Sequence, residues 1–176
     1  NADGLPGTFC GNGSRCILSY FCYKNKETDS PISFSFWEKS YSGWCNGRNS
    51  FSVNLNIPEI SGLNLKIDTS FGEVKYDFIN TGSPHIVVYE ESLINPVNVQ
   101  GNGFEAFALE LRHHSFFAPG GVNVNLVAKS GMDLKIRTFE RGVERETLAC
   151  GSGTAAAAVS AGLKGIADSP VVFEPK

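Results

Sequence analysis

The chain has 176 residues, of which 41% are hydrophobic and 19% are charged, so it can bury a sizeable core as one domain or two small ones. Its formal net charge is −3 and it has no basic block, which argues against nucleic acid or an anionic membrane as a partner. The sequence contains no apolar stretch long enough for a membrane span and no signal-peptide pattern.

The chain opens on a polar turn. No methionine precedes Asn1, and the turn Asn1-Ala2-Asp3-Gly4 has no strand before it. We therefore expect the sequence to be the middle of a longer protein. A second turn dipeptide, Pro6-Gly7, leads into Cys10 and a predicted helix over about residues 11–24, which a polar run ends.

Short alternating segments follow this helix. Residues 32–37, 41–45 and 51–55 alternate with a period of two and are rich in aromatic or β-branched side chains, which is typical of strands. Asn46-Gly47 is a strong hairpin turn. Pro58-Glu59 breaks the pattern, so we predict two domains: residues 1–57 as the remainder of an N-terminal half, and residues 58–176 as a C-terminal half.

The second half repeats this plan with more strands. We predict strands at 63–68, 73–78 and 85–89, a short helix at 104–111, a hairpin of 122–128 and 134–139, a helix at 151–164 with Gly165 as its C-cap, and a strand from 171. Because the strands outnumber the helices and adjoin as hairpins, the pattern favours the α+β class over a parallel α/β sheet. The last helix is apolar nearly all round, so we expect it to be buried with a sheet around it.

One motif occurs twice. Residues 10–14 and 150–154 both read Cys-Gly-x-Gly-[Ser/Thr], and each begins a predicted helix. Glycines let backbone N–H groups approach a ligand, and a helix N-terminus carries partial positive charge. Because such a position favours a thiolate, we expect Cys10 and Cys150 to have a lowered pKa. The repetition predicts two reactive thiols that face one anion-binding pocket.

The other cysteines give no sign of a framework. Five is an odd number, and the spacing matches neither a set of disulfides nor a zinc ribbon. The simplest interpretation is reduced thiols in a cytoplasmic enzyme. Cys16, Cys22 and Cys45 fit core or neutral positions, because a free cysteine behaves as a small hydrophobe.

Metal and nucleotide sites are not expected. His113 and His114 adjoin each other, which is not the spacing of two ligands on one helical face. Residues 151–156 superficially match a dinucleotide fingerprint, but no predicted strand runs directly into them and no acidic residue ends a following strand at the required distance. The sequence shows no persuasive cofactor motif.

Two thiols in one pocket suit a defined chemistry. Inverting a carbon that bears an amine and a carboxylate requires removal of the α-proton from one face and return of a proton to the other. A thiolate base and a thiol acid on opposite sides can do this without a cofactor, because the pKa of cysteine can be set near neutrality. The helix N-termini would stabilise the substrate carboxylate and the developing carbanion.

Several longer motifs resemble the diaminopimelate epimerase family. They are Asn1-x-Asp3-Gly4, Cys10-Gly11-Asn12-Gly13-x-Arg15-Cys16, Gly82-x-Pro84-His85, Pro119-Gly120-x-x-Asn123-Val124-Asn125, Glu140-Arg141-Gly142-Val143 and Glu146-Thr147-Leu148-Ala149-Cys150-Gly151-Ser152-Gly153. The resemblance spans essentially the whole chain. It implies that the family's N-terminal stretch, with its own Asn motif, and its C-terminal tail lie outside this sequence.

This resemblance implies a fold and an activity. The fold would be two pseudo-symmetric halves, each a mixed or antiparallel sheet around a central helix, with the active site in the cleft between them. The activity would be the cofactor-independent interconversion of LL- and meso-2,6-diaminoheptanedioate, an isomerase step of lysine biosynthesis in the cytoplasm. Members of the family are usually homodimers.

The resemblance also implies residue roles. Cys10 and Cys150 would be the catalytic acid and base, and His85 and Glu140 would support them. Substrate binding would fall to Asn1, Gly11, Asn12, Ser83, Asn123, Glu140, Arg141, Gly151 and Ser152. From the residues alone, those beside the cysteines are equally helix caps, and the Asn positions equally turn or strand ends.

Three positions depart from the family pattern. Ser83 stands where an Asn is usual, Leu5 stands where a small polar residue is common, and the loop at 143–146 is one residue longer than the commonest form. Ser83 therefore predicts a substrate hydrogen bond that is shorter, water-bridged or lost.

Three alternatives remain open from the sequence. Two low-pKa thiols that approach each other would also serve a redox dithiol protein. A cofactor-independent racemase of another amino acid, such as proline, would share the fold. The chain could also be an inactive fragment that only folds.

Overall fold

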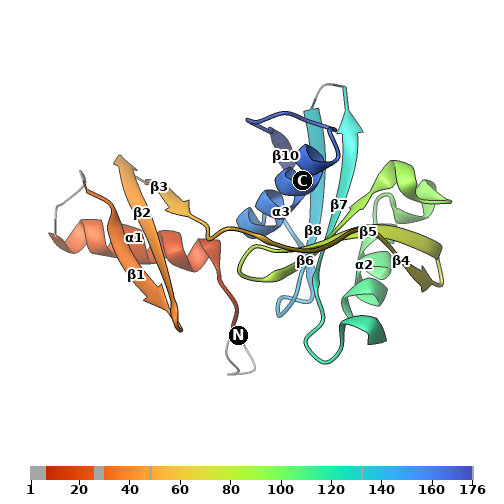
Figure 1. Cartoon of the computed structure of the whole chain (residues 1–176), viewed down its shortest axis with the longest axis horizontal. Coiled ribbons are helices and arrows are strands. Elements are labelled where there is room, and N and C mark those ends of the chain that lie inside the picture. Colours follow the sequence, from red (N-terminus) through yellow and green to blue (C-terminus); the bar gives the residue numbers. More distant parts are fainter. Residues whose placement is uncertain (1–6, 26–29, 48, 132, 176) are drawn as a thin grey trace.

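The computed structural model describes residues 7–25, 30–47, 49–131 and 133–175. The chain forms a smaller part, which contains α1 (Gly11–Asn25), β1 (Ile32–Phe36), β2 (Lys39–Gly47) and β3 (Ser50–Asn54), and a larger part. The larger part begins with β4 (Glu59–Thr69), β5 (Gly72–Asn80) and β6 (Pro84–Tyr89). Figure 1 shows the two parts side by side, joined by the segment between β3 and β4.

The rest of the larger part alternates short helices with strands. Its elements are two 3₁₀ turns (Glu90–Ser92 and Pro96–Val99), α2 (Gly103–Arg112), a third 3₁₀ turn (Ser115–Phe117), β7 (Asn123–Ser130), β8 (Asp133–Glu140), β9 (Arg145–Thr147), α3 (Gly151–Leu163) and β10 (Phe173–Pro175). Within the described ranges, no helix is both long and apolar enough to cross a membrane.

The smaller part is an antiparallel sheet packed on one helix. Its strand order is β1-β2-β3, and Leu18 of α1 is completely buried against Ile32 and Cys45. Phe9, which immediately precedes Cys10, stacks on Tyr41 with ring centroids 4.6 Å apart. This contact fixes the entry to α1, so the position of Cys10 depends on the sheet.

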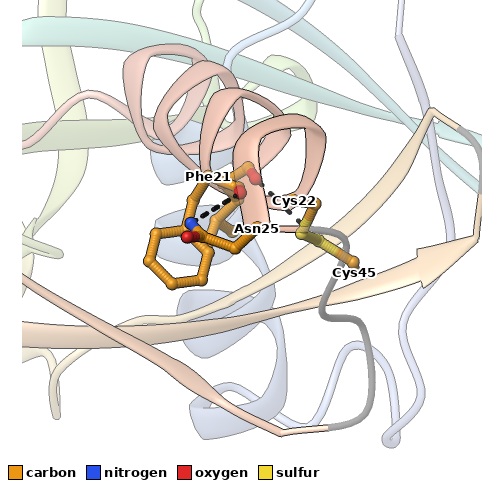
Figure 2. Close-up of a disulfide and its surroundings, with 5 residues drawn as sticks. Phe21, Cys22, Asn25 and Cys45 are labelled. Carbon is orange, nitrogen blue, oxygen red and sulfur yellow. Dashed lines mark hydrogen bonds between the residues drawn. A yellow bond between two sulfur atoms is a disulfide. The ribbon is translucent and has the colours of Figure 1, made fainter.

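A disulfide joins Cys22 of α1 to Cys45 of β2 (Figure 2). At the end of the same helix, the Asn25 side chain donates a hydrogen bond of 3.0 Å to the Phe21 carbonyl. The prediction that Cys22 and Cys45 are reduced is therefore wrong. The spacing of 23 residues gives no hint of the pairing, because only the packing of α1 on β2 brings the two side chains together.

The larger part is a seven-stranded mixed sheet between two helices. Its order is β10-β8-β7-β6-β5-β4, with β9 paired to β8; β6 and β7 are parallel, as are β8 and β10. Successive residues of the central strands face opposite helices. Ile86 and Val88 join the cluster around α2, whereas Val87 and Tyr89 join the cluster around α3. Figure 1 shows α2 and α3 on opposite sides of β7 and β8.

These observations confirm the predicted α+β class and the predicted helices and strands. The hairpin turn predicted at Asn46-Gly47 is wrong, because both residues belong to β2, and the last strand begins at Phe173 instead of 171. The parallel pairing of β6 with β7 and the three-residue strand β9 were not predicted, since the first follows only from a crossover through α2 and the second is too short to show a period. The three-stranded sheet ends at Asn54 and the larger sheet begins at Glu59, on either side of the boundary between residues 57 and 58. The division into two domains there stays a prediction.

Candidate active site

A cavity of about 270 Å³ lies where the two parts meet. It is lined by Thr8, Phe9, Cys10, Gly11, Asn12, Ser83, Asn123, Glu140, Arg141, Gly142, Val143, Cys150, Gly151 and Ser152. The first five come from the smaller part and the others from the larger one. The cavity therefore depends on both parts for its walls.

The N-termini of α1 and α3 meet at this cavity. Each begins one residue after a cysteine, at Gly11 and Gly151. A Cβ built on Gly11 would lie 3.8 Å from Nη1 of Arg15, and one built on Gly151 would lie 3.9 Å from the same atom. The Arg15 guanidinium therefore sits beside both helix starts, where it adds positive charge to the backbone N–H groups.

Both cysteine sulfurs receive a backbone N–H from the first turn of their helix. The Gly13 N–H donates to Cys10 Sγ over 3.4 Å, and the Gly153 N–H bonds the Cys150 sulfur in the same way. Cys10 is exposed, whereas Cys150 is 8% exposed. The repeated motif thus builds the same local geometry twice, in different surroundings.

The pKa of the Cys150 thiol is raised. Burial is the main cause, and the charge of Glu140 and a hydrogen bond to its carboxylate act in the same direction; the bonds from the Ser152 hydroxyl and the Gly153 N–H only partly offset them. The prediction of a lowered pKa is therefore wrong for Cys150. Burial and the neighbouring carboxylate outweigh the helix N-terminus.

His85 lies behind the wall of the cavity and is completely buried. Its Nε2 is 2.8 Å from Ser83 Oγ and 3.0 Å from Ser152 Oγ, and Ser152 Oγ lies 3.4 Å from Cys150 Sγ. Burial lowers the pKa of His85 to about 3, and the positive charge of Arg141 contributes. The ring is therefore neutral at physiological pH, one side chain away from the thiol.

Asn123 and Arg141 are tied to the backbone and to each other. Asn123 Nδ2 donates to the Pro84 carbonyl at 2.8 Å, and Asn123 Oδ1 accepts the Arg141 N–H at 2.9 Å. The Arg141 guanidinium donates to Thr8 Oγ1 at 3.2 Å, which connects the larger part to the smaller one. Burial lowers the pKa of Arg141, and the charge of Arg112 contributes.

The turn after β8 is held by Glu144. One Glu144 carboxylate oxygen accepts the Gly142 N–H at 2.9 Å and bonds of 3.1 and 2.8 Å from Arg112, and the other lies 3.1 Å from His113 Nε2. Burial alone would raise the pKa of Glu144, but the Gly142 N–H and Arg112 outweigh it, so the pKa is lowered. Glu140 begins this turn, and its carboxylate accepts a 2.6 Å bond from Thr147.

Most of the predicted site residues meet in this cavity. Those that line it are Cys10, Gly11, Asn12, Ser83, Asn123, Glu140, Arg141, Cys150, Gly151 and Ser152. His85 lies one contact away, and Asn1 lies outside the described residues. Their roles stay proposals, because geometry alone does not assign them.

Sequence reasoning overlooked residues that act through their neighbours. The Asn125 amide forms a hydrogen bond with His85, and the Glu144 carboxylate accepts the N–H of Gly142 in the turn that contains Arg141. For Asn125 a signal existed, since it lies two residues after Asn123 on a strand and so shares its face. In the described ranges, no three His, Cys, Asp or Glu side chains are grouped so that they could hold a metal ion.

The fold is shared with solved structures of racemases and epimerases. A hydroxyproline epimerase from Agrobacterium vitis, solved with bound trans-4-hydroxy-L-proline, superposes with a TM-score of 0.68 at 15% identity over 97% of this chain and 56% of that one. A probable proline racemase from Agrobacterium radiobacter K84 gives 0.65 at 18% identity, with the same coverage. The chain therefore has the fold of this class of proteins.

The chain belongs to the diaminopimelate epimerase family. The family model described as diaminopimelate epimerase matches residues 78–175. Diaminopimelate epimerases of Hydrogenobaculum sp. and Aquifex aeolicus are 38% and 39% identical over 98% and 94% of this chain. The chain spans 61% and 57% of the length of these two relatives.

Proposed function

We propose that the protein interconverts LL- and meso-2,6-diaminoheptanedioate by moving the α-proton between Cys10 and Cys150. The observation that carries this proposal is the meeting of two helix N-termini, each with a cysteine sulfur under its first turn, in one cavity. Family membership supplies the substrate. The relatives are longer than this chain, so the activity of the whole protein is part of the proposal.

In one direction, Cys10 acts as the base. Its thiolate takes the α-proton and becomes a thiol, and the electron pair of the broken C–H bond remains on the substrate as a carbanion. Cys150 then gives its thiol proton to the opposite face and becomes a thiolate. The raised pKa of Cys150 supports this assignment, because it keeps that sulfur protonated before the reaction. In the reverse direction the two roles are exchanged.

The two ends of the substrate meet different surroundings. The N–H groups at the starts of α1 and α3, that of Ser152 included, and the Asn12 side chain would bind the carboxylate next to the reacting carbon. Arg141, Asn123 and Ser83 would bind the distal amino-acid group, where a guanidinium can pair with a carboxylate. Glu140 would accept from the substrate ammonium while its charge acts on Cys150.

The test is α-deuterium uptake from D₂O into LL-diaminoheptanedioate by wild type, Cys10→Ser and Cys150→Ser. We expect exchange and epimerisation by wild type, and a loss of epimerisation of at least about 100-fold in either variant, since general acid–base catalysis contributes about 10²–10⁴. A folded wild type without exchange would contradict the proposal. A redox dithiol protein would instead form a Cys10–Cys150 disulfide that reductant reverses.

A racemase of a cyclic amino acid is the second candidate, because the fold neighbours are proteins of that kind. Proline and trans-4-hydroxy-L-proline in the same assay decide between the two. Glu140, Arg141 and Asn123 favour a substrate with a second amino-acid end.

The proposal also includes a role in lysine biosynthesis, a cytoplasmic location and a homodimeric state. All three are inferred from membership of the family. The Cys22–Cys45 disulfide makes the location testable, because structural disulfides are rare in the cytosol. Rapid alkylation of thiols in lysed cells, followed by mass spectrometry, would show whether the pair is oxidised there. Light scattering of the purified protein would give its oligomeric state.

A further inference from the structure

Five buried polar side chains form a continuous line from β8 to α3. Thr138 Oγ1 lies 3.1 Å from Asn125 Oδ1, and Asn125 Nδ2 lies 3.1 Å from His85 Nδ1. The line continues from His85 Nε2 to Ser152 and ends at Cys150. Asn125 does not line the cavity and is completely buried. The hydrogen bonds of this line therefore connect Asn125 to the reacting sulfur through His85 and Ser152.

The orientation of the Asn125 amide is fixed by its neighbours. Its Nδ2 lies 2.9 Å from the Ile86 carbonyl oxygen, which can only accept a hydrogen bond. Nδ2 is therefore the amino group, and the Thr138 hydroxyl donates to the remaining oxygen. The same amino group faces His85 Nδ1, so this ring nitrogen must be the acceptor.

A neutral imidazole that accepts at Nδ1 carries its proton on Nε2. This Nε2–H points to Ser83 Oγ and Ser152 Oγ, and both oxygens must accept. The Ser152 hydroxyl proton cannot go to the ring, since the ring nitrogen that it faces is already a donor. Among the described residues, the remaining hydrogen-bond partner of the Ser152 hydroxyl is Cys150 Sγ, at 3.4 Å.

The first turn of α3 is shaped around this line. A Cβ on Gly153 would overlap Asn125 Oδ1 and would lie 3.4 Å from His85 Cε1. The glycine therefore lets the helix start close enough for Ser152 to reach both His85 and Cys150.

We propose that Asn125 is a positioning residue, which fixes His85 in the Nε2–H tautomer and thereby directs the Ser152 hydroxyl proton onto the Cys150 sulfur. The role of Cys150 as acid and base rests on the proposed function, but the direction of the hydrogen bonds does not. Since the Ser152 proton stabilises the thiolate, losing it lowers the thiolate fraction of Cys150 about tenfold at a given pH. The charged groups that face this line are Glu140, at Cys150, and Arg141, at His85.

The first measurement needs no variant. Nuclear magnetic resonance of protein with ¹⁵N-labelled histidine reports which ring nitrogen of His85 carries the proton. We expect Nε2–H throughout the neutral pH range. Nδ1–H would overturn the proposal.

The second measurement is a double-mutant cycle between Asn125→Leu and Ser152→Ala. Its readout is the pH dependence of Cys150 alkylation, followed on the isolated peptide by mass spectrometry. We expect each single variant to slow alkylation at neutral pH about tenfold, and the double variant to be no slower than Ser152→Ala alone. Effects that multiply in the double variant would overturn the proposal.

Ser160→Ala is the matched control. Ser160 is buried in the same helix and bonds Asp77 at 2.6 Å and Tyr89 at 2.7 Å, away from Cys150. We expect this variant to lose stability without a shift in Cys150 alkylation.

Turnover separates this inference from the proposed function. If the enzyme is active, Asn125→Leu lowers kcat about tenfold and leaves KM unchanged, because Asn125 does not touch the cavity. An inactive protein with the expected tautomer and coupling would contradict the proposed function alone. An active protein without the coupling would contradict the inference alone.

Discussion

At the scale of single residues, the two cysteines show how surroundings change one motif. Each sulfur accepts an N–H at the start of a helix, yet Cys10 is exposed, whereas Cys150 is buried and next to the Glu140 carboxylate. A sequence motif indicates the helix start beside each cysteine, but it does not indicate the burial of the sulfur or the carboxylate next to it. The cysteine positions could therefore be predicted, and the raised pKa of Cys150 could not, because Glu140 reaches it only through the fold.

The buried His85 makes the free energy of unfolding depend on pH. Its pKa in the folded protein is about 3, below the ordinary value of 6.5, so unfolding takes up a proton between these values. The stabilisation is complete above pH 6.5 and is lost as the pH falls towards 3. Relative to His85→Asn, wild type should lose about 1.4 kcal/mol of unfolding free energy per pH unit in this window. Urea denaturation from pH 7 to pH 4 measures it, and parallel curves for the two proteins would contradict the buried neutral ring.

At the scale of elements, the first turn of α3 and the turn after β8 shape the cavity. The helix α3 itself could be predicted from its apolar run, and the seven-stranded sheet could be predicted only in pieces. The parallel neighbours β6 and β7 place His85 and Asn125 on the same side, and no local pattern indicates which strands become neighbours. The Glu144 contacts were missed for the same reason, since Arg112 and His113 lie about thirty residues away.

Two glycines of α3 should respond in opposite ways to alanine. Gly153→Ala forces a Cβ onto Asn125, so we expect a loss of about 1–3 kcal/mol despite the better helix propensity of alanine. Gly162→Ala is the control, since its Cβ would have no neighbour nearer than 4.0 Å and should stabilise the protein by about 0.5 kcal/mol. Thermal unfolding of both variants checks the prediction. A Gly153→Ala protein as stable as wild type would show that α3 does not fit tightly against β7.

The Glu144 carboxylate should matter for binding. Glu144→Gln removes the charge that pairs with Arg112, so the turn that carries Arg141 loosens. We expect KM for diaminoheptanedioate to rise about tenfold and stability to fall by about 1 kcal/mol. Glu174→Gln is the matched control, because its ion pair with Lys135 is 3.5 Å long and exposed on both sides. Equal effects of the two substitutions would refute a special role for the turn.

At the scale of the whole molecule, the site depends on how the two parts are held together. Phe9 N–H donates to the Gly82 carbonyl at 3.2 Å, and Arg141 reaches Thr8. These contacts join the two parts next to the cavity. The resemblance could predict an active site between two halves. The hydrogen bonds that close the site join residues 73 and 133 positions apart, beyond the reach of any local pattern.

The disulfide should stabilise the smaller part alone. It closes a loop with a sequence separation of 23 residues, for which chain entropy predicts about 3 kcal/mol. Hydrogen exchange followed by mass spectrometry should show that reductant accelerates exchange in α1 and β2 and leaves β6 to β8 unchanged. The double variant Cys22→Ala/Cys45→Ala should exchange at the faster rate with or without reductant. Faster exchange across both sheets would show that the two parts unfold together.

The three free cysteines differ in setting within one molecule. Cys16 is exposed on α1 and does not line the cavity, Cys10 is exposed at its edge, and Cys150 is buried in its wall. Every alkylation experiment on this protein therefore contains its own reference thiol. Dividing the Cys10 and Cys150 rates by the Cys16 rate cancels reagent concentration and decay, so the ratios can be compared directly between variants, pH values and preparations.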